Sequence, residues 1–238
     1  MNIISRLSRK PFSIIGHRGA KGLEPENTLR SISRALEIGV DIVEIDVRST
    51  KDGVLILLHD EDFSRVAGIP VKARNLAFKE IREEIRVYGE SVPTLEEALE
   101  FVNGKSGLFI EIKEPETTGN IIKLLRRCGL PESVALVSFH DEALIAARRM
   151  EQSIVTGLIY SRPPGRIIDA KKIGAKIVLP RYPLATEKAV SLAHRLGLKV
   201  AVWTVNDPSI AEKMVERGVD AIATDYPDRL VELRESYK

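Results

Sequence analysis

The sequence predicts an α/β protein with the TIM (β/α)8 barrel fold. Short apolar runs typical of buried strands alternate with amphipathic helical stretches along the whole chain of 238 residues. Eight such pairs in a chain of this length are typical of a TIM barrel, in which each parallel strand is followed by a helix. An open doubly wound sheet fits less well, because no glycine-rich dinucleotide loop follows the first apolar run. The expected strands are 13–17, 41–47, 107–112, 134–138, 154–158, 176–179, 199–203 and 220–223.

One strand-like segment breaks this alternation. The run VLILLH at 54–59 follows the second expected strand after only a few residues. A parallel crossover needs a dozen or more residues, so this run is not one of the eight barrel strands. The Asp52-Gly53 pair instead indicates a tight turn, and the sequence predicts a β-hairpin. This hairpin strand and a short helical segment would form a small insertion after the second barrel strand, at about 49–92.

Helix boundaries are marked by capping residues and glycines. Asn27 precedes the helical stretch 28–38, so we expect it to cap that helix. Thr94, with Glu97 three residues later, forms the capping-box pattern at the start of another helix. No linker or low-complexity segment interrupts the chain, and the sequence predicts a single domain over residues 1–238. The glycines expected in the left-handed conformation at helix ends are Gly39, Gly129, Gly174, Gly197 and Gly218.

The composition argues against several classes of protein. The 36 Lys and Arg residues and the 34 Asp and Glu residues are interspersed, and no basic patch favours a nucleic-acid partner. The apolar stretch near the start covers only 12–15, which is too short for a signal peptide or a membrane span. The single cysteine, Cys128, fits a reducing compartment, and we expect it to be a small core residue. We therefore expect a cytoplasmic protein with no nucleic-acid partner and no stable insertion into a membrane.

Acidic side chains gather at the ends of two expected strands. In a TIM barrel the functional residues lie at the carboxyl ends of the strands. Because side chains alternate along a strand, Glu44 and Asp46 share the face that points into the mouth of the barrel. Glu111 and Lys113 repeat this pattern in the third strand. The sequence thus places three carboxylates and a lysine at one mouth.

Three carboxylates at one mouth repel one another unless positive charge offsets them. A divalent cation would relieve this repulsion, and such ions readily take carboxylate oxygens as ligands. The alternative is a set of ion pairs in which Arg18, Arg48 and Lys113 neutralise the acids. Spacing alone favours neither alternative.

The predicted hairpin brings a histidine to the same mouth. If Thr50 and Gly53 close the turn, the pairing sets His59 directly opposite Glu44. Directly paired residues lie on one face of the sheet, with Cβ atoms roughly 5 Å apart. A slip of one residue would turn His59 away from the acids. The register of the hairpin therefore decides whether this histidine belongs to the site.

The first apolar run ends abruptly in His17-Arg18, where a buried strand normally meets a neutral turn. Together with His59, this cluster supplies two imidazoles and a guanidinium beside the acids. A cation with two histidines, an arginine and a lysine suits cleavage of a phosphate ester, with one histidine removing a proton and the other supplying one. His140 and His194, the other two histidines, lack such neighbours, and we interpret them as structural residues.

A family resemblance extends over most of the chain. The sequence contains, in order, HRGAKGLEPENT, VEIDVRSTKDGVLILLHD, PTLEEAL, FIEIK, VWTVND and GVDAIATDYPD. Together these stretches, over about residues 16–228, resemble the glycerophosphodiester phosphodiesterases. The resemblance implies a TIM barrel that hydrolyses glycerophosphodiesters to glycerol 3-phosphate and an alcohol, with one divalent metal ion (Mg²⁺, Ca²⁺ or Mn²⁺).

The resemblance also implies roles for individual residues. It assigns acid–base catalysis to His17 and His59. Glu26 is not expected to be a ligand, and Trp203, which from its position alone would be a core residue, matches an aromatic of the family's pocket. The implied metal ligands are Glu44, Asp46 and Glu111, and the implied substrate contacts are Arg18, Lys113 and Trp203.

Two other functions compete with this one. An enzyme resembling lysophospholipase D, or acting on another phosphodiester, could use the same residues. A binding module without catalysis could share the fold, since fold does not determine function. Such a module would be expected to lack a histidine or a metal ligand, and none is missing. The expected partner is a small-molecule glycerophosphodiester substrate, and nothing in the sequence specifies an oligomeric state.

Overall fold

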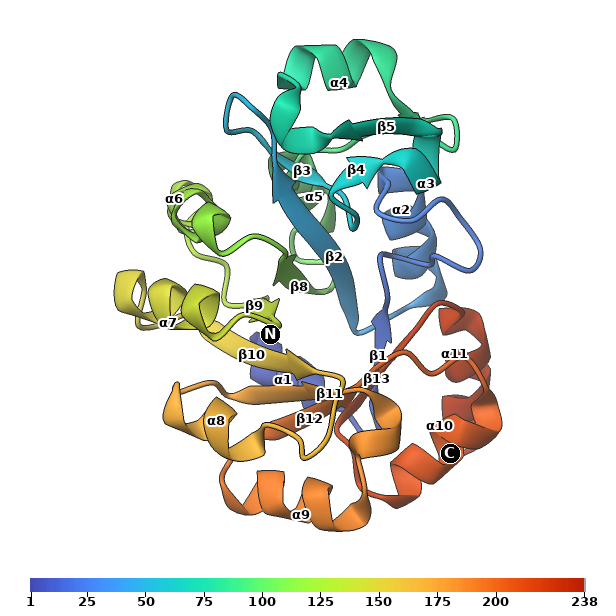
Figure 1. The fold of residues 1–238 in the computed structure, drawn as a ribbon. Helices are drawn as coiled ribbons and strands as arrows, with labels where there is room; N and C mark the ends of the chain where they lie inside the picture. Colours follow the sequence, from blue (N-terminus) through green and yellow to red (C-terminus); the bar gives the residue numbers. More distant parts are fainter. Residues whose placement is uncertain (238) are drawn as a thin grey trace.

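A computed structural model describes residues 1–237 and confirms the predicted TIM barrel. Eight parallel strands form a closed sheet in the order β1-β13-β12-β11-β10-β9-β8-β2, and β2 pairs with β1 to complete the ring (Figure 1). Each observed strand overlaps an expected one. The strands are β1 Ser13–Gly16, β2 Ile42–Ser49, β8 Gly107–Ile112, β9 Val134–Ser138, β10 Val155–Tyr160, β11 Ile177–Pro180, β12 Lys199–Val202 and β13 Ala221–Thr224.

Helices cover the outside of the barrel, as Figure 1 shows. The side chains of Val43, Ile45 and Val47 on β2 pack outward in the apolar layer between strands and helices. Ile42 on the same strand packs instead among the side chains that fill the barrel interior. The covering helices are α2 Leu29–Ile38, α5 Leu95–Val102, α6 Thr118–Arg127, α7 Asp141–Met150, α8 Ile167–Lys172, α9 Glu187–Arg195, α10 Pro208–Glu216 and α11 Pro227–Glu235.

A short helix, α1 (Ile3–Leu7), closes the amino-terminal end of the barrel. Its residues Ile3 and Leu7 are fully buried and belong to the apolar cluster of the barrel interior. A Cβ on Gly107 at the start of β8 would come within 2.7 Å of Ile3, which shows how closely α1 approaches the strand. Side chains of α1 therefore fill the barrel interior at its amino-terminal end, and the carboxyl ends of the strands form the open mouth. Within residues 1–237, no helix has the length and apolar character needed to cross a membrane.

The predicted insertion lies between β2 and α5. Strand β3 (Leu55–Leu57) pairs antiparallel with β2, and the segment that follows packs around an apolar cluster of its own, which includes Phe63 and Ile81. In Figure 1 the insertion stands beside the mouth, next to β2. Its other elements are β4 Asp62–Phe63, α3 Ser64–Ala67, β5 Ile69–Lys72, a 3-10 turn Ala73–Asn75, α4 Phe78–Glu84, β6 Arg86–Val87 and β7 Glu90–Ser91.

The predicted hairpin register is wrong by one residue. Val47 pairs with Leu57, and continuing this ladder would set His59 opposite Ile45 rather than Glu44. The reason is the turn: the N–H of Thr50 donates to the carbonyl of Val54, so Gly53 lies inside the turn rather than closing it.

His59 still lines the cavity at the mouth. It lies beyond the end of β3 at Leu57, so the alternation of side chains along a paired strand no longer determines which way it points. The N–H of Leu58 donates to the carbonyl of Asp46, and the chain then leaves the strand. The histidine therefore joins the site from a loop rather than from a paired strand position.

Two smaller expectations are also wrong. The cap of α2 is Thr28, whose side chain accepts a hydrogen bond from Ser31 N–H, and Asn27 has a different role, described below. Cys128 is exposed at the carboxyl end of α6 rather than buried in the core. The Thr94–Glu97 capping box is confirmed, as is the left-handed backbone of the glycines expected at helix ends.

Candidate active site

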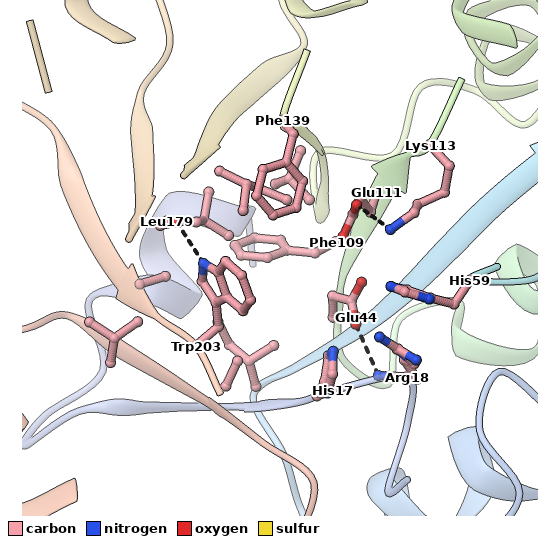
Figure 2. Close-up of a pocket in the computed structure, with 16 residues that line it drawn as sticks. His17, Arg18, Glu44, His59, Phe109, Glu111, Lys113, Phe139, Leu179 and Trp203 are labelled. Carbon is pink, nitrogen blue, oxygen red and sulfur yellow. Dashed lines mark hydrogen bonds and ion pairs between the residues drawn. The ribbon is translucent and has the colours of Figure 1, made fainter. Parts of the chain in front are cut away.

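A cavity of about 190 Å³ opens at the carboxyl ends of the barrel strands. Figure 2 shows that it has two unlike walls. The apolar wall consists mainly of Phe109, Phe139, Leu179 and Trp203. The polar wall consists of His17, Arg18, Glu44, His59, Glu111 and Lys113, all of which are predicted site residues.

The three predicted metal ligands converge beside this cavity. One oxygen from each of Glu44, Asp46 and Glu111 lies within 4.8 Å of the other two. The parallel register of β2 and β8 pairs Asp46 with Glu111, which brings these two acids side by side. All three side chains are buried, and Asp46 is only 1% exposed. The alternation of side chains along β2 and β8 thus places the acids as the sequence predicts.

Burial and mutual repulsion act on the pKa values of these acids. Burial raises the pKa of Glu44 well above its usual range, and the charges of Asp46 and Glu111 raise it further. Burial and the Asp46 charge raise the pKa of Glu111 to about 7. Burial also acts to raise the pKa of Asp46, but the charges of Lys113 and Arg18 outweigh it and lower this pKa. Burial and mutual repulsion thus oppose simultaneous ionisation of Glu44 and Glu111 beside Asp46, and a further cation would favour it.

Two cations contact the acids directly. Lys113 Nζ lies 2.6 Å from Glu111 Oε1 and 3.4 Å from Asp46 Oδ1. Arg18 Nε lies 3.1 Å from Asp46 Oδ2, without hydrogen-bond geometry. Arg48, which the ion-pair alternative also invoked, instead pairs with a glutamate outside the cluster and with a backbone carbonyl. The ion pairs seen in the structure thus leave one carboxylate of the three without a matching cation.

The backbone of the His17–Gly19 segment is shaped by its contacts. Arg18 has a φ of 52°, a left-handed conformation that is costly for a residue with a side chain. In this conformation its N–H donates to Glu44 Oε2 at 2.9 Å. A Cβ on Gly16 would lie 2.4 Å from the Gly19 carbonyl, so glycine allows the chain to fold back tightly here. The turn brings both Arg18 and the imidazole of His17 to the mouth.

Glu26 and Asn27 support the site, and sequence reasoning missed both roles. Glu26 accepts hydrogen bonds from Arg18 Nη1 at 2.8 Å and, through both oxygens, from Arg65 of the insertion. Asn27 Nδ2 donates to Asp46 Oδ2 at 2.8 Å, and Asp46 N–H donates to Asn27 Oδ1. Neither contact could be found from spacing, because both depend on how the loop after β1 folds over β2.

Each site histidine has a carboxylate partner. His17 Nδ1 lies 2.6 Å from Asp225 Oδ1, and His59 Nδ1 lies 2.6 Å from Asp60 Oδ1. Burial lowers the pKa of both histidines, although the bond from Asp225 opposes this for His17 and the Asp46 charge opposes it for His59. With Nδ1 occupied in both rings, Nε2 is the nitrogen free to act. Figure 2 shows both rings directed toward Glu44.

The apolar wall is built around Trp203. Its indole Nε1 donates to the carbonyl of Leu179 at 2.8 Å, and this hydrogen bond holds the ring in place as part of the cavity wall. Phe139 packs edge-on against it, with ring centroids 5.6 Å apart. Sequence reasoning missed Phe139, although it follows directly after β9 at the carboxyl end of the barrel. His140 and His194 do not line this cavity, in keeping with the structural roles expected for them.

Comparisons with known proteins show which family the chain resembles. Residues 17–229 match the model of the glycerophosphoryl diester phosphodiesterase family. A glycerophosphodiester phosphodiesterase of Caldanaerobacter subterraneus subsp. tengcongensis is 31% identical, over 92% of this chain and 96% of the relative. A solved structure described as a putative glycerophosphoryl diester phosphodiesterase from Silicibacter pomeroyi superposes with a TM-score of 0.90 at 26% identity, covering 99% of this chain and 97% of the other.

A second solved structure is that of an Oleispira antarctica phosphodiesterase in complex with the product sn-glycerol-3-phosphate. It superposes with a TM-score of 0.86 at 28% identity, covering 94% of this chain and 96% of the other. The family match covers nearly all of the sequence and includes every residue of the polar wall. The chain therefore belongs to the glycerophosphoryl diester phosphodiesterase family and is an enzyme of that class.

Proposed function

We propose that this enzyme hydrolyses glycerophosphodiesters to glycerol 3-phosphate and an alcohol, with a divalent metal ion held by Glu44, Asp46 and Glu111. The observation that carries this proposal is the cluster itself: three buried carboxylate oxygens lie within 4.8 Å of one another. Among residues 1–237, only two cations, Arg18 and Lys113, form ion pairs with these acids. A buried group of like charges without full compensation is costly, and a bound cation removes that cost.

The donor set indicates the kind of metal. All three side chains offer carboxylate oxygens, which suit Mg²⁺, Mn²⁺ or Ca²⁺ rather than an ion that prefers thiolates. When bound, the ion supplies positive charge that polarises the phosphoryl group. The remaining steps belong to the side chains of the polar wall.

Arg18 and Lys113 are proposed to bind the phosphate. Both line the cavity, and both carry their charge on the side of the acids. Arg18 is oriented by Glu26, and Lys113 is oriented by Glu111. Cations held in this way favour the transition state, because they face the oxygens on which negative charge develops.

His17 and His59 are proposed to exchange protons with the substrate through Nε2. We assign His59 as the base that takes the proton from the attacking hydroxyl, which belongs to the glycerol of the substrate, and His17 as the acid that protonates the departing alkoxide. Water then opens the cyclic phosphate formed in this step, with the roles of the two histidines exchanged, and gives glycerol 3-phosphate. Both rings have Nδ1 bonded to a carboxylate, which leaves Nε2 directed at the cavity. An alkoxide leaves poorly without a proton, so the acid is as necessary as the base.

A second candidate function is attack on a lysophospholipid or another phosphodiester with an apolar substituent. The observation that favours it is the apolar wall, where Trp203 and Phe139 offer no free hydrogen-bonding group. We propose that Trp203 contacts the substrate in either case. A cytoplasmic location, which the single cysteine favours, belongs to the same proposal.

The test measures release of glycerol 3-phosphate from a panel of glycerophosphodiesters, and release of the free alcohol from lysophospholipids, with and without a chelator. The proposal predicts turnover of glycerophosphodiesters with added Mg²⁺, Mn²⁺ or Ca²⁺ and none with excess EDTA. Turnover confined to lysophospholipids would favour the second candidate. Full activity in the chelator would contradict the metal site.

A further inference from the structure

We propose that Asp225 is a positioning residue that holds His17 in the Nδ1–H tautomer, so that Nε2 is the nitrogen that faces the substrate. This inference rests on the proposed role of His17 in proton transfer. It holds whether His17 acts as acid or as base, because both roles use Nε2. Three residues that follow barrel strands form the contacts: His17 after β1, Asn206 after β12 and Asp225 after β13.

The barrel itself brings Asp225 to His17. Strand β1 pairs in parallel with β13, with Gly16 opposite Thr224, and the N–H of His17 donates to the carbonyl of Thr224. The residues that follow the two strands are therefore neighbours at the mouth. Their side chains meet with Asp225 Oδ1 2.6 Å from His17 Nδ1. The contact is built on the rigid sheet, although the two residues are 208 positions apart in the sequence.

Asp225 is itself held on its other oxygen. Asn206 Nδ2 donates to Asp225 Oδ2 at 2.8 Å. The orientation of the Asn206 amide is fixed, because its Oδ1 accepts hydrogen bonds from Asp225 N–H at 2.9 Å and from Thr224 Oγ1 at 3.1 Å. A 180° flip of the amide would break both bonds. The network therefore fixes Oδ2 of Asp225 as a hydrogen-bond acceptor, and an ionised carboxylate also presents an acceptor, Oδ1, to His17 Nδ1. A carboxamide with its oxygen at the Oδ2 position would present an NH2 donor to His17 instead.

The ionisation of Asp225 is consistent with this arrangement. Burial acts to raise its pKa, but the hydrogen bond and charge of His17 outweigh burial and lower the pKa of Asp225 to about 2. As an ionised acceptor, Asp225 requires Nδ1 of His17 to carry a hydrogen. Nε2 is then the nitrogen that gains or loses the catalytic proton, and Asp225 stabilises the ring when it is positively charged.

This geometry predicts an unusual order among substitutions. In Asp225→Asn, the amide oxygen must face the donor of Asn206, so its NH2 group faces His17 Nδ1. Nδ1 then has to accept, and the ring hydrogen moves to Nε2, which is the wrong tautomer. Asp225→Ala removes the partner without imposing a tautomer. The conservative Asn variant should therefore be slower than the Ala variant, whereas a merely structural role would give the opposite order.

The experiment measures kcat and KM for a glycerophosphodiester with an alkyl leaving group, in the metal-loaded full chain. We expect kcat of Asp225→Asn to fall by roughly 10²–10⁴-fold with little change in KM, and kcat of Asp225→Ala to fall less. In a His17→Ala background, Asp225→Asn should change kcat by less than about twofold, because the residue acts through His17. Asp207→Asn, which removes a carboxylate that caps α10 next to Asn206, is the matched control and should keep wild-type kcat.

A second measurement does not depend on the folding of any Asp225 variant. Nitrogen-15 NMR of the wild-type histidines reports which ring nitrogen of His17 carries the hydrogen, with His17→Ala used for assignment. The inference predicts hydrogen on Nδ1 when the ring is neutral. Hydrogen on Nε2 would overturn it, as would an Asp225→Asn variant faster than Asp225→Ala or a full additional loss in the His17→Ala background. An active His17→Ala variant would instead contradict the proposed role of His17, and the NMR result would still decide the tautomer.

Discussion

Two buried carboxylates near β2 differ in what surrounds them. Asp41, just before the strand, is 4% exposed and lies between Arg9 on one oxygen and Arg234 on the other. It also accepts the N–H of Ile14. Glu44, three residues later, is 7% exposed and faces two further acids. A neutralised carboxylate thus lies just before β2, at the closed end of the barrel, and a crowded one lies on β2 beside the mouth.

The difference shows how a structural acid can be told from a functional one. Asp41 links the N-terminal segment to α11 through its two arginines, and its charge is fully offset. Glu44 accepts a hydrogen bond from the backbone N–H of Arg18 but forms no ion pair within the described part of the chain, and burial with the neighbouring charges raises its pKa. Burial alone does not distinguish a functional site, since both residues are buried. An excess of buried negative charge does distinguish it, because such an excess destabilises the fold and a bound cation relieves it.

The largest expected effect is that of metal removal. Dialysis against EDTA should abolish turnover, and adding Mg²⁺ or Mn²⁺ should restore it. The same ion should raise the thermal midpoint, since an ion at about 100 times its Kd stabilises the folded state by about 2.7 kcal/mol. Calorimetric scans with and without the ion check this. A thermal midpoint that does not respond to any divalent ion would contradict the difference drawn between Glu44 and Asp41.

The next prediction concerns replacement of each of the two acids by its amide. Glu44→Gln should lose nearly all activity, while its metal-free stability should hold or rise because repulsion falls. Asp41→Asn should keep metal binding but lose roughly 3 kcal/mol of stability, because two arginines then lack their partner. Urea unfolding of both metal-free variants measures this. If Glu44→Gln is the less stable of the two, Glu44 is a structural ion-pair residue.

The third prediction concerns pH. A carboxyl whose pKa is raised in the folded state binds its proton more tightly there than in the unfolded state, so it favours folding at low pH. Glu111 is raised from 4.5 to about 7, and Glu44 is raised as well. The free energy of unfolding of the metal-free protein should therefore fall as the pH rises from about 4.5 to about 7. Glu111→Gln should flatten this slope, and an unchanged slope would show that the acids are already compensated.

The smallest expected effect is at Asn27, whose amide holds Asp46. Its φ of 55° favours glycine, so Asn27→Gly removes the amide without adding backbone strain. Loss of such a supporting hydrogen bond should weaken metal affinity by roughly 10–100-fold. Isothermal titration with Mn²⁺ measures this, with Thr94→Gly, which removes a helix cap away from the mouth, as the control. Equal affinity in wild type and Asn27→Gly would show that Asp46 needs no support.

Much of the site could be predicted because it depends on local rules. The two-residue period of β2 and β8 places Glu44, Asp46 and Glu111 on one face, and the strand ends bring His17 to the mouth. His59 was predicted at the mouth for the wrong reason. The register depended on whether Gly53 or Val54 closes the turn, and a change of one residue reverses the face.

The contacts that support the site were beyond the sequence because they join distant segments. Asn27 was expected to cap α2, but its left-handed backbone turns the side chain toward Asp46. Glu26 meets Arg65 only because the insertion folds beside the loop after β1. Asp225 is a partial exception: it follows the last strand at its carboxyl end, where the rule for TIM barrels would have singled it out.

The most direct test of the metal site counts bound ions. Mn²⁺ can be titrated into the metal-free protein and the free ion followed by electron paramagnetic resonance, in wild type, Asp46→Asn and Asp41→Asn. We expect one tightly bound ion per chain in wild type and in Asp41→Asn, and a loss of more than about 100-fold in affinity in Asp46→Asn. Wild-type protein that binds no stoichiometric ion, or an Asp46→Asn variant that binds as well as wild type, would contradict it.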